Sequence, residues 1–286
     1  MAENRLVAVV TGGAGGFGRA ISATLAERGD SVVVVDLDAA GAVAVAAALP
    51  TDRRADQRHL GVGCDLRDED SVAAVFGEVA DLLGASHVLV NSGGVREITS
   101  IVEISTAEWA DVIATNLTGT FLACREFARR AVAAADGAAR SVVNIASVAG
   151  LVGVANRPAY SASKHGVIGL SKNLATDLAR YGVRVNVVAP GTIRTPMTEG
   201  YYADEEFVAS LSAVVPLGAG GSAQDVADAV AFLTGPGSRF VTGVVLPVDG
   251  GWSAEKSYSL NPNSAYFAAA NGTGAVGGGT PPREDS

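Results

Sequence analysis

Strand-length runs of apolar residues alternate with alanine-rich stretches of helical length along most of this chain. The run Ser31–Asp36 reads SVVVVD and the run His87–Asn91 reads HVLVN, so apolar residues follow one another instead of alternating with polar ones. Continuous apolar strands are typical of a parallel sheet whose two faces are both covered by helices. Their alternation with helices predicts βαβ units joined by right-handed crossovers. We therefore predict an α/β fold with a doubly wound parallel sheet of about seven strands.

The expected elements form one domain, because no change in composition marks a boundary within residues 1–252. We expect strands at Leu6–Val10, Ser31–Asp36, His59–Cys64, His87–Asn91, Ser141–Ala146, Arg184–Ala189 and Val244–Val248. We expect helices near Gly16–Arg28, Ala39–Ala48, Glu69–Leu83, Thr106–Ala134, Ala159–Tyr181 and Ala223–Leu233. The long connection 192–215 carries an acidic DEE run and a short helical pattern, and it is predicted to be a substrate lid.

Residues 253–286 differ from the rest of the chain in composition. They are rich in Ala, Gly, Ser, Pro and Asn and end in NGTGAVGGGTPPREDS. A segment of this kind cannot bury a core, and we expect a flexible C-terminal extension. The whole sequence is 48% hydrophobic and 18% charged, which indicates a globular protein over most of its 286 residues.

Charge and cysteine content narrow the partners and the compartment. A formal net charge of −9 argues against binding of nucleic acid through a basic field. The apolar runs are far shorter than a membrane span, and the N-terminal MAENR lacks the layout of a signal peptide. Cys64 and Cys124 are too few for a disulfide framework, so we expect buried free thiols in a cytoplasmic protein. We expect no metal site.

The first strand run leads directly into the glycine-rich segment Gly12–Gly18, which is followed by a helical pattern. Glycines at such a junction allow a tight turn, a close approach of the backbone to a pyrophosphate and tight helix–strand packing. The helix N-terminus then presents free N–H groups to the anion. No Lys-Ser/Thr pair follows, which argues against a P-loop ATPase. The segment predicts a dinucleotide site of the Rossmann type at the strand ends.

Asp36 ends the second strand run, at about the distance from Gly18 at which dinucleotide-binding folds carry a ribose-binding carboxylate. A carboxylate there accepts hydrogen bonds from both adenosine ribose hydroxyls and repels a 2′-phosphate. Leu37 and Gly15 offer no compensating positive charge, and Arg19 begins the helix, where it can equally face solvent. These residues predict NAD as the cofactor. An NADPH-dependent ketone reductase is the alternative.

Tyr160 and Lys164 lie four residues apart in YSASK, and Ser147 precedes them in NIAS. Residues at i and i+4 share one face of a helix, so the phenol and the amine are predicted to project side by side. A nearby positive charge favours phenolate, and we expect it to lower the tyrosine pKa from its ordinary value of about 10. A phenol tuned in this way can give a proton to a carbonyl oxygen or take one from an alcohol.

Taken together, these segments resemble the short-chain dehydrogenase/reductase family in its single-domain form, over about residues 5–252. TGGAGGFG at Thr11–Gly18 matches T-G-x-x-x-G-x-G. NSGG at Asn91–Gly94 resembles N-N-A-G, with Ser and Gly replacing Asn and Ala. CDL at Cys64–Leu66 resembles the segment in which an Asp contacts adenine, and PGTIRT at Pro190–Thr195 resembles P-G-x-[VI]-x-T, which borders the nicotinamide. Asn116 in TNLTG matches the helix Asn of an Asn-Ser-Tyr-Lys tetrad.

The resemblance implies a role for each of these positions. Contacts with the cofactor are implied for Gly12, Gly15, Gly16, Phe17, Gly18, Asp36, Leu37, Asp65, Leu66, Asn91, Gly93, Tyr160, Lys164, Pro190, Gly191, Ile193 and Thr195. In catalysis Tyr160 would be the general acid/base, and Lys164 would lower its pKa and hold the nicotinamide ribose. Ser147 would bind the substrate oxygen, and Asn116 would support a water chain from Lys164 toward solvent. The implied activity is NAD-dependent interconversion of a secondary alcohol and a ketone.

The substrate pocket is expected to be mostly apolar, which favours a hydrophobic secondary alcohol or ketone. Its walls are predicted to be Val95, Val148, Leu151, Val154 and, from the lid, Met197, Tyr201 and Tyr202. Arg96 and Arg157 could instead meet an anionic group, although arginines in loops are commonly solvated. The resemblance also implies a homotetramer, built through Thr106–Ala134, Ala159–Tyr181 and the final strand. A nucleotide-binding regulator without turnover is the alternative from a different functional class, and the intact Ser-Tyr-Lys set argues against it.

Overall fold

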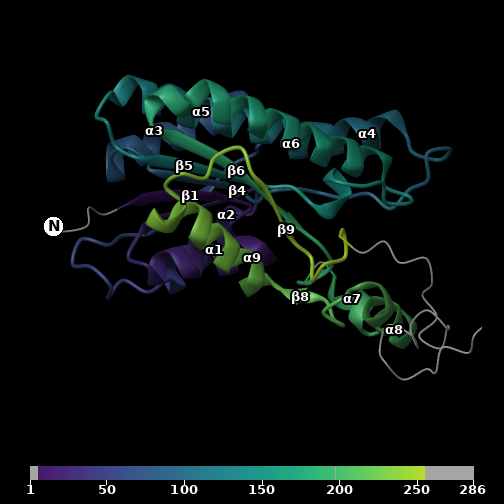
Figure 1. Ribbon diagram of the computed structural model, residues 1–286. Coiled ribbons are helices and arrows are strands. Elements are labelled where there is room, and N and C mark those ends of the chain that lie inside the picture. The colour runs from purple at the N-terminus through teal and green to yellow at the C-terminus, as the bar shows by residue number, and fades with distance from the viewer. Residues whose placement is uncertain (1–5, 197, 255–286) are drawn as a thin grey trace, which may run out of the picture.

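The structure is a computed structural model that describes residues 6–196 and 198–254. Its centre is a parallel sheet of seven strands in the order β3-β2-β1-β4-β5-β6-β9 (Figure 1). The strands are β1 Val7–Thr11, β2 Ser31–Asp36, β3 Leu60–Gly63, β4 Val88–Asn91, β5 Arg140–Ile145, β6 Val183–Pro190 and β9 Val245–Val248. The predicted doubly wound α/β fold is confirmed, and each predicted strand lies within about two residues of an observed one.

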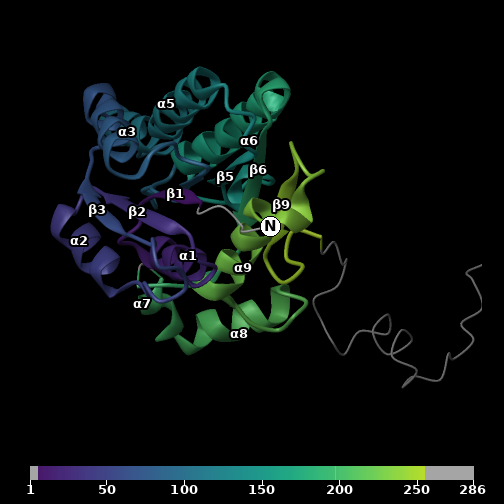
Figure 2. The same cartoon turned by 90° about the vertical axis from the view of Figure 1, so that its left-hand side faces the viewer.

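Helices cover both faces of the sheet. One layer holds α3 Glu69–Leu83, α4 Thr106–Ile113, α5 Gly119–Ala134 and α6 Pro158–Leu178. The other layer holds α1 Gly16–Glu27, α2 Ala39–Ala48 and α9 Ala223–Thr234. Figure 2, a view turned by a quarter of a circle, shows the two layers on opposite sides of the strands.

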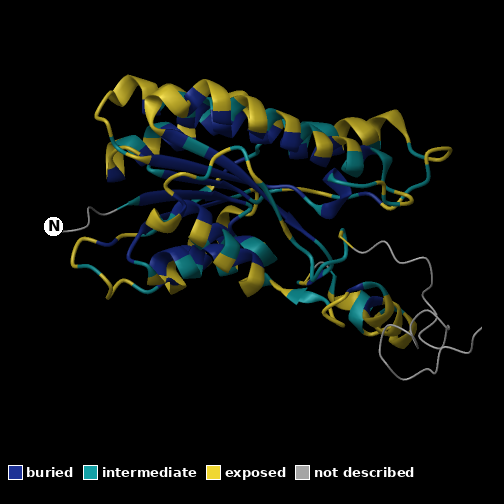
Figure 3. Cartoon of the chain, viewed as in Figure 1, coloured by how far each residue is buried: buried dark blue, intermediate teal, exposed yellow. Residues whose placement is uncertain are grey.

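The two helical layers explain why the strands are apolar throughout. Val33 and Val35 of β2 join the core on the α3–α5 side, whereas Val32 and Val34 join the core on the α1–α9 side. All four side chains are almost completely buried, as the dark sheet in Figure 3 shows. Because successive side chains of a strand point to opposite faces, a strand covered on both sides has no position for a solvated residue.

The chain reverses its direction of winding between β1 and β4. Strands β2 and β3 lie on one side of β1, and the chain then crosses back to place β4 on its other side. In open α/β sheets the crevice beyond the carboxyl ends of such a pair of strands is the usual ligand site. The residues that follow β1 and β4 therefore meet at this crevice.

The predicted helix Thr106–Ala134 is interrupted, contrary to expectation. A π-helical turn, η1 Ala114–Thr118, separates α4 from α5 and places Asn116 in full burial. π-turns inside helices are frequently found at functional sites. An extra residue in one helical turn leaves the apolar periodicity nearly intact, so the sequence pattern does not reveal it.

The connection predicted as a lid contains structure of its own. It holds β7 Ile193–Arg194, α7 Glu199–Tyr202 and α8 Glu205–Val214, and β7 pairs in parallel with β8 Gly221–Ser222. These elements lie beyond the carboxyl end of the main sheet (Figure 1). The small second sheet was not predicted, since two-residue strands carry no periodic signal.

Three further predictions concern the cysteines, membrane-spanning segments and the C-terminal extension. Cys64 and Cys124 are buried free thiols, as expected. Within the described residues, no helix combines the length and apolar character needed to cross a bilayer. The C-terminal extension predicted from residue 253 onward lies almost entirely outside the described residues.

Candidate active site

A cavity of about 730 Å³ opens at the carboxyl ends of β1, β4, β5 and β6. Such a volume is typical of sites for small molecules and cofactors. Most of the predicted site residues line it: Gly12, Gly15, Gly16, Phe17, Asp36, Leu37, Asp65, Leu66, Gly93, Arg96, Ser147, Val148, Tyr160, Lys164, Pro190, Gly191, Ile193 and Thr195. Five predicted residues do not line it: Gly18, Asn91, Asn116, Leu151 and Tyr202.

The glycine-rich turn forms one end of the cavity. Gly12 has a φ of +63°, and a Cβ there would lie 2.5 Å from the Cα of Gly93 in the turn after the neighbouring strand β4. A Cβ at Gly18 would collide with the carbonyl oxygen of Gly12, so Gly18 allows close packing without lining the cavity. Gly15 begins α1 in an extended conformation, and no side chain caps that helix. An uncapped helix N-terminus facing a cavity is suited to a pyrophosphate.

Asp36 stands at the edge of this turn. Its carboxylate accepts hydrogen bonds from the backbone N–H of Ala14, at 3.0 Å, and of Asp38, at 3.2 Å. Arg19 donates from its Nε to the carbonyl oxygen of Ala14 and is not part of the cavity lining. The side chain of Leu37 is exposed. The carboxylate is thus fixed by the glycine turn in the position where a ribose could bind it.

Asp65 and Leu66 follow β3 and line the same half of the cavity. The carboxylate of Asp65 is held by the guanidinium of Arg67 at 2.8 Å, and Arg67 in turn contacts Asp111 at 2.8 Å. Leu66 packs against the turn after β4, since a Cβ at Gly93 would lie 2.7 Å from its Cδ1. An alanine at position 93 would therefore require the end of the Leu66 side chain to shift.

Asn91 does not take part in the cavity, contrary to expectation. Its Nδ2 donates to the Oδ1 of Asn144 at 2.8 Å and to the Sγ of Cys124 at 3.3 Å. Asn144 donates onward to the Oγ of Ser171 at 2.8 Å. All four side chains are buried, so this network ties β4 and β5 to α5 and α6. The sequence does not show whether an asparagine at the end of a strand faces a ligand or a neighbouring strand.

Ser147, Tyr160 and Lys164 converge on the other half of the cavity. Ser147 lies two residues after the end of β5, and its hydroxyl accepts the backbone N–H of Ala149 at 3.1 Å. The same hydroxyl is close enough to the phenol of Tyr160 to lower its pKa. Lys164 is buried, and its amine donates to the carbonyl oxygen of Ile145 at 2.9 Å. The same amine lies 5.6 Å from the centroid of the Tyr160 ring. The predicted side-by-side arrangement of phenol and amine is therefore confirmed.

The prediction that the pKa of Tyr160 is lowered is wrong where only the groups of the protein act on it. Burial raises the pKa of Tyr160, because phenolate loses solvation; the bond from Ser147 and the charges of Arg157 and Arg96 oppose this, and Glu97 adds to it. Burial also lowers the pKa of Lys164 to about 8. The amine is therefore only partly charged near pH 8, which weakens the effect expected of it.

Asn116 lies behind the residues that line the cavity, and its side chain connects the backbone of Val95 with α6. Its Oδ1 accepts from the backbone N–H of Val95 at 2.8 Å, and its Nδ2 donates to the Val95 carbonyl at 2.8 Å and to the Oγ of Ser163 at 3.1 Å. A Cβ at Gly94 would lie 3.0 Å from the Asn116 Oδ1 and 3.6 Å from the Lys164 amine. The amide therefore sits close to the catalytic helix, and its predicted support of a water chain stays a prediction.

The substrate half of the cavity differs in part from expectation. Val95, Val148, Val154 and Tyr201 line it as predicted. Leu151 instead packs against the core group that includes Val167 and Ile168. Tyr202 turns its hydroxyl toward Gly220 and away from the lining. Met197 lies outside the described residues.

Several lining residues were missed. Phe207 of α8 and Trp252 after β9 face the cavity, as does Thr198. In the sequence, the only sign of such a residue is an aromatic side chain in the lid or after a strand end. That sign does not distinguish a residue that lines the cavity from one that lies on the protein surface.

The charged residues of the cavity are divided between its two halves. Arg96 and Arg157 both line the substrate half, and the Arg96 guanidinium lies 5.0 Å from the centroid of the Tyr201 ring. The acidic lining residues Asp36, Asp65 and Asp111 lie on the nucleotide side. In the described ranges, no cluster of His, Cys, Asp and Glu is arranged to hold a metal ion.

Comparisons with known proteins agree with this geometry. A family model described as enoyl-(acyl carrier protein) reductase matches residues 12–253. The chain is 43% identical to cis-4-hydroxycyclohexanecarboxylate dehydrogenase of Sinomonas cyclohexanicum, over 87% of this chain and 96% of the relative. It is 39% identical to D-threitol dehydrogenase of Mycolicibacterium smegmatis, over 86% of this chain and 92% of the relative. The solved structure of 4-hydroxyisoleucine dehydrogenase complexed with NADH superposes with a TM-score of 0.80 at 30% identity, covering 88% of this chain and all of that one.

The buried amine of Lys164 leads to a prediction about stability. Below pH 8 the folded protein holds a buried charge, so Lys164→Met is expected to raise the free energy of unfolding at pH 7 by about 1–3 kcal/mol, after loss of the bond to Ile145 is counted. Between pH 8 and 10.5 the unfolded chain binds more protons at this residue than the folded one, so the wild type gains stability as the pH rises. The advantage of the variant should therefore shrink over that window.

Urea denaturation of both proteins between pH 7 and 10.5 measures the difference directly. A Lys164→Met protein less stable than the wild type at pH 7 would contradict the prediction. So would a stability difference that stays constant as the pH rises.

Proposed function

The chain belongs to the short-chain dehydrogenase/reductase family, and from that premise we propose that it is an NAD-dependent enzyme that interconverts a secondary alcohol and a ketone by hydride transfer. The observation that carries the proposal is the meeting of Ser147, Tyr160 and Lys164 with an uncapped glycine turn in one cavity. Relatives that are 39–43% identical to the chain are dehydrogenases and a reductase that act on alcohol or ketone groups. Oxidoreductase activity is thus a property of the family, and the cofactor and the proton chemistry are what we propose for this chain.

The described residues fit a dinucleotide on observations of the structure itself. A Cβ at Gly12 or Gly18 would fill the turn, the N-terminus of α1 is free of a capping side chain, and Asp36 is held at the ribose end. When bound, the nicotinamide supplies the acceptor or donor of hydride. Lys164 and the Pro190–Thr195 segment line the cavity, and we propose that they would hold its ribose and ring.

We infer that NAD is preferred to NADP because of Asp36. Its carboxylate already accepts two backbone hydrogen bonds and is half-buried, so it cannot turn away from a 2′-phosphate. Two like charges held this close together are unfavourable. The NADH complex of the 4-hydroxyisoleucine dehydrogenase supports the same choice by similarity. An NADPH-dependent ketone reductase stays the alternative.

Tyr160 is proposed as the group that moves the proton. In ketone reduction its hydroxyl would give a proton to the carbonyl oxygen, and in alcohol oxidation its phenolate would take one. Because burial raises its pKa, the phenol is protonated at neutral pH and suited to the acid role, whereas the oxidation rate should rise with pH. Ser147, whose hydroxyl lies near the phenol and lowers its pKa, would share the substrate oxygen.

We infer that the substrate carries a carboxylate on a compact, mostly apolar skeleton. The apolar wall includes Val95, Val148 and Val154, which favours a hydrocarbon frame. Arg96 and Arg157 lie close enough to Tyr160 for their charges to lower its pKa, and so within reach of a short substrate bound there. The similarity to a hydroxycyclohexanecarboxylate dehydrogenase supports this class. Two arginines in a half-buried site are well suited to bind a carboxylate.

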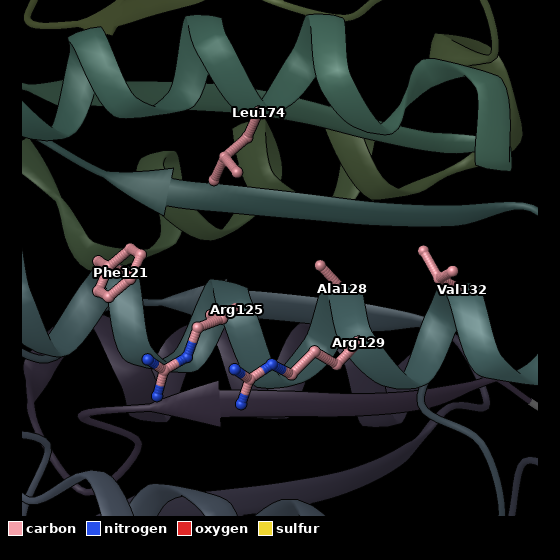
Figure 4. A pocket seen from close by; sticks show the side chains of 6 residues that line it. All are labelled: Phe121, Arg125, Ala128, Arg129, Val132 and Leu174. Atoms are coloured by element: carbon pink, nitrogen blue, oxygen red, sulfur yellow. The ribbon is translucent and has the colours of Figure 1, made fainter.

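The assembly proposed is a homotetramer, with α5 and α6 in one of its interfaces. A hollow of about 430 Å³ lies between these helices on the outer face, lined by Phe121, Arg125, Ala128, Arg129, Val132 and Leu174 (Figure 4). Phe121 and Val132 are about 40% exposed, which is unusual for a pair of large apolar residues beside one hollow. A second copy of the same face is the occupant we propose. The cytoplasmic location stays a prediction.

Activity with a panel of secondary alcohols tests the proposed function. NADH absorbance should appear with NAD and cis-4-hydroxycyclohexanecarboxylate or a close analogue, and Tyr160→Phe should lower kcat by a factor of about 10² to 10⁴. Binding of NAD and the melting temperature should stay near those of the wild type, because only a hydroxyl is removed. Full turnover in Tyr160→Phe would refute the acid/base role, and tighter binding of NADPH than NADH would overturn the use of Asp36.

The role of the two arginines is tested with a matched pair of substrates. For Arg157→Gln and Arg96→Gln, kcat/KM for 4-hydroxycyclohexanecarboxylate should fall by about 10- to 100-fold, the worth of a hydrogen bond to a charged group. The corresponding carboxamide should lose much less. Comparing the two substrates cancels the effect of either arginine on Tyr160 itself. Equal losses on acid and amide would contradict the carboxylate site, and Arg180→Gln, at an exposed arginine beyond the far end of α6, is the control.

The assembly is tested by analytical ultracentrifugation. The wild type should sediment as a tetramer at micromolar concentration. Phe121→Arg should yield smaller species, because it replaces an exposed aromatic side chain of the hollow with a third arginine beside Arg125 and Arg129. Val43→Arg, at an exposed position of α2 on the other side of the sheet, should leave the tetramer intact. A monomeric wild type would refute the proposal.

A further inference from the structure

The helix that carries Tyr160 and Lys164 begins without a capping side chain of its own. Arg157 occupies the N-cap position of α6 and makes no side-chain capping bond, and Pro158 follows at the first helical position. The N–H groups of the first helical turn have no intrahelical acceptor and need one from elsewhere. Tyr160 is the third residue of this helix, the position whose N–H an N-cap side chain usually serves.

Glu97 supplies the missing acceptor from the loop between β4 and α4. Both of its carboxylate oxygens accept the backbone N–H of Tyr160, at 2.9 and 3.1 Å. The side chain is only 4% exposed, although carboxylates are rarely buried without a specific partner. A negative charge at a helix N-terminus is favoured by the helix dipole. A residue 63 positions away in sequence thus caps the catalytic helix at its catalytic residue.

The loop that carries Glu97 is itself held on both sides. Asn116 binds both the N–H and the carbonyl of Val95, at 2.8 Å each. On the other side, the N–H of Thr99 donates to the carbonyl of Asn156, just before α6, at 3.0 Å. Glu97 therefore stands on a short, doubly anchored segment that connects the π-turn at Asn116 with the first turn of α6.

We propose that Glu97 is a positioning residue for Tyr160, which holds the backbone of the first turn of α6 so that the phenol meets Ser147 and the reacting oxygen. The inference rests on the proposed acid/base role of Tyr160. A capping residue of the fold alone would affect stability, whereas a positioning residue affects the catalytic step through Tyr160. A displacement of the reacting group by about 1 Å is enough to lower a rate by about 100-fold.

The charge of Glu97 has a second consequence. The charged and polar groups that face the phenol are Glu97 and Arg96 from the loop after β4, Arg157 before α6, Ser147 after β5 and the amine of Lys164. Among them Glu97 raises the pKa of Tyr160, and Ser147, Arg157 and Arg96 lower it. Removing the negative charge while keeping the shape should therefore let phenolate form at a lower pH.

Two substitutions separate the geometry from the charge. Glu97→Ala removes the acceptor, and we expect kcat to fall by about 10- to 100-fold with the KM for NAD unchanged. Glu97→Gln keeps one oxygen acceptor, so most of kcat should be rescued, with the rising limb of the pH profile for alcohol oxidation shifted to lower pH. Glu103→Gln is the matched control, because Glu103 is an exposed glutamate of the same loop whose carboxylate accepts a hydrogen bond from the Ser100 hydroxyl. Hydrogen exchange of the peptide that contains Tyr160 should quicken in Glu97→Ala alone.

A double-mutant cycle identifies the residue through which Glu97 acts. In a Tyr160→Phe background, Glu97→Ala should lower the residual rate no further, because the phenol whose position it controls is gone. An equal loss in both backgrounds, or unchanged kcat in Glu97→Ala, would overturn the proposal. If Glu97→Ala does not fold, a Glu97→Gln pH profile identical to that of the wild type would overturn it as well. Failure of the proposed function has a different signature, which is turnover that persists in the single variant Tyr160→Phe.

Discussion

The contact between the first turns of α6 and the end of β5 is the constraint on which the site depends. The amine of Lys164 donates to the last carbonyl of β5, and the segment Val148–Gly150 packs so closely on α6 that a Cβ at Gly150 would lie 2.8 Å from the Lys164 carbonyl oxygen. This packing brings the serine after the strand to the tyrosine on the helix. Because the sheet is covered on both faces by helices, it gives the three groups a rigid support.

The same packing sets the electrostatics of the site. Burial disfavours the charged form of each partner, so the phenol of Tyr160 holds its proton more firmly and the amine of Lys164 holds its proton less firmly than in water. Arginines on the substrate side and Glu97 on the helix side then act on the phenol in opposite directions. Burial and a small set of charges therefore act together on the pKa of the Tyr160 phenol, which is a common feature of acid/base sites.

Much of the fold could be predicted because the same physical pattern recurs in every βαβ unit. Strands such as β2, buried on both faces, leave an unbroken apolar run, and the glycine turn after β1 has few alternative uses. Residues whose role depends on a distant partner could not be assigned in this way. Asn91 turned out to pair with Asn144, Leu151 with the core beneath α6, and Glu97 with a backbone N–H that sequence does not display. The direction of the Tyr160 pKa was mispredicted for the same reason, since burial is a property of the fold and not of the spacing.

A structure of the protein with NAD and a ketone or alcohol substrate is the most direct test of the account. The Tyr160 hydroxyl should lie within about 2.6–3.2 Å of the reacting oxygen, with Ser147 on the same oxygen and the Lys164 amine at the nicotinamide ribose. A phenol turned away from the reacting carbon in that complex, or an amine out of reach of the ribose, would contradict it.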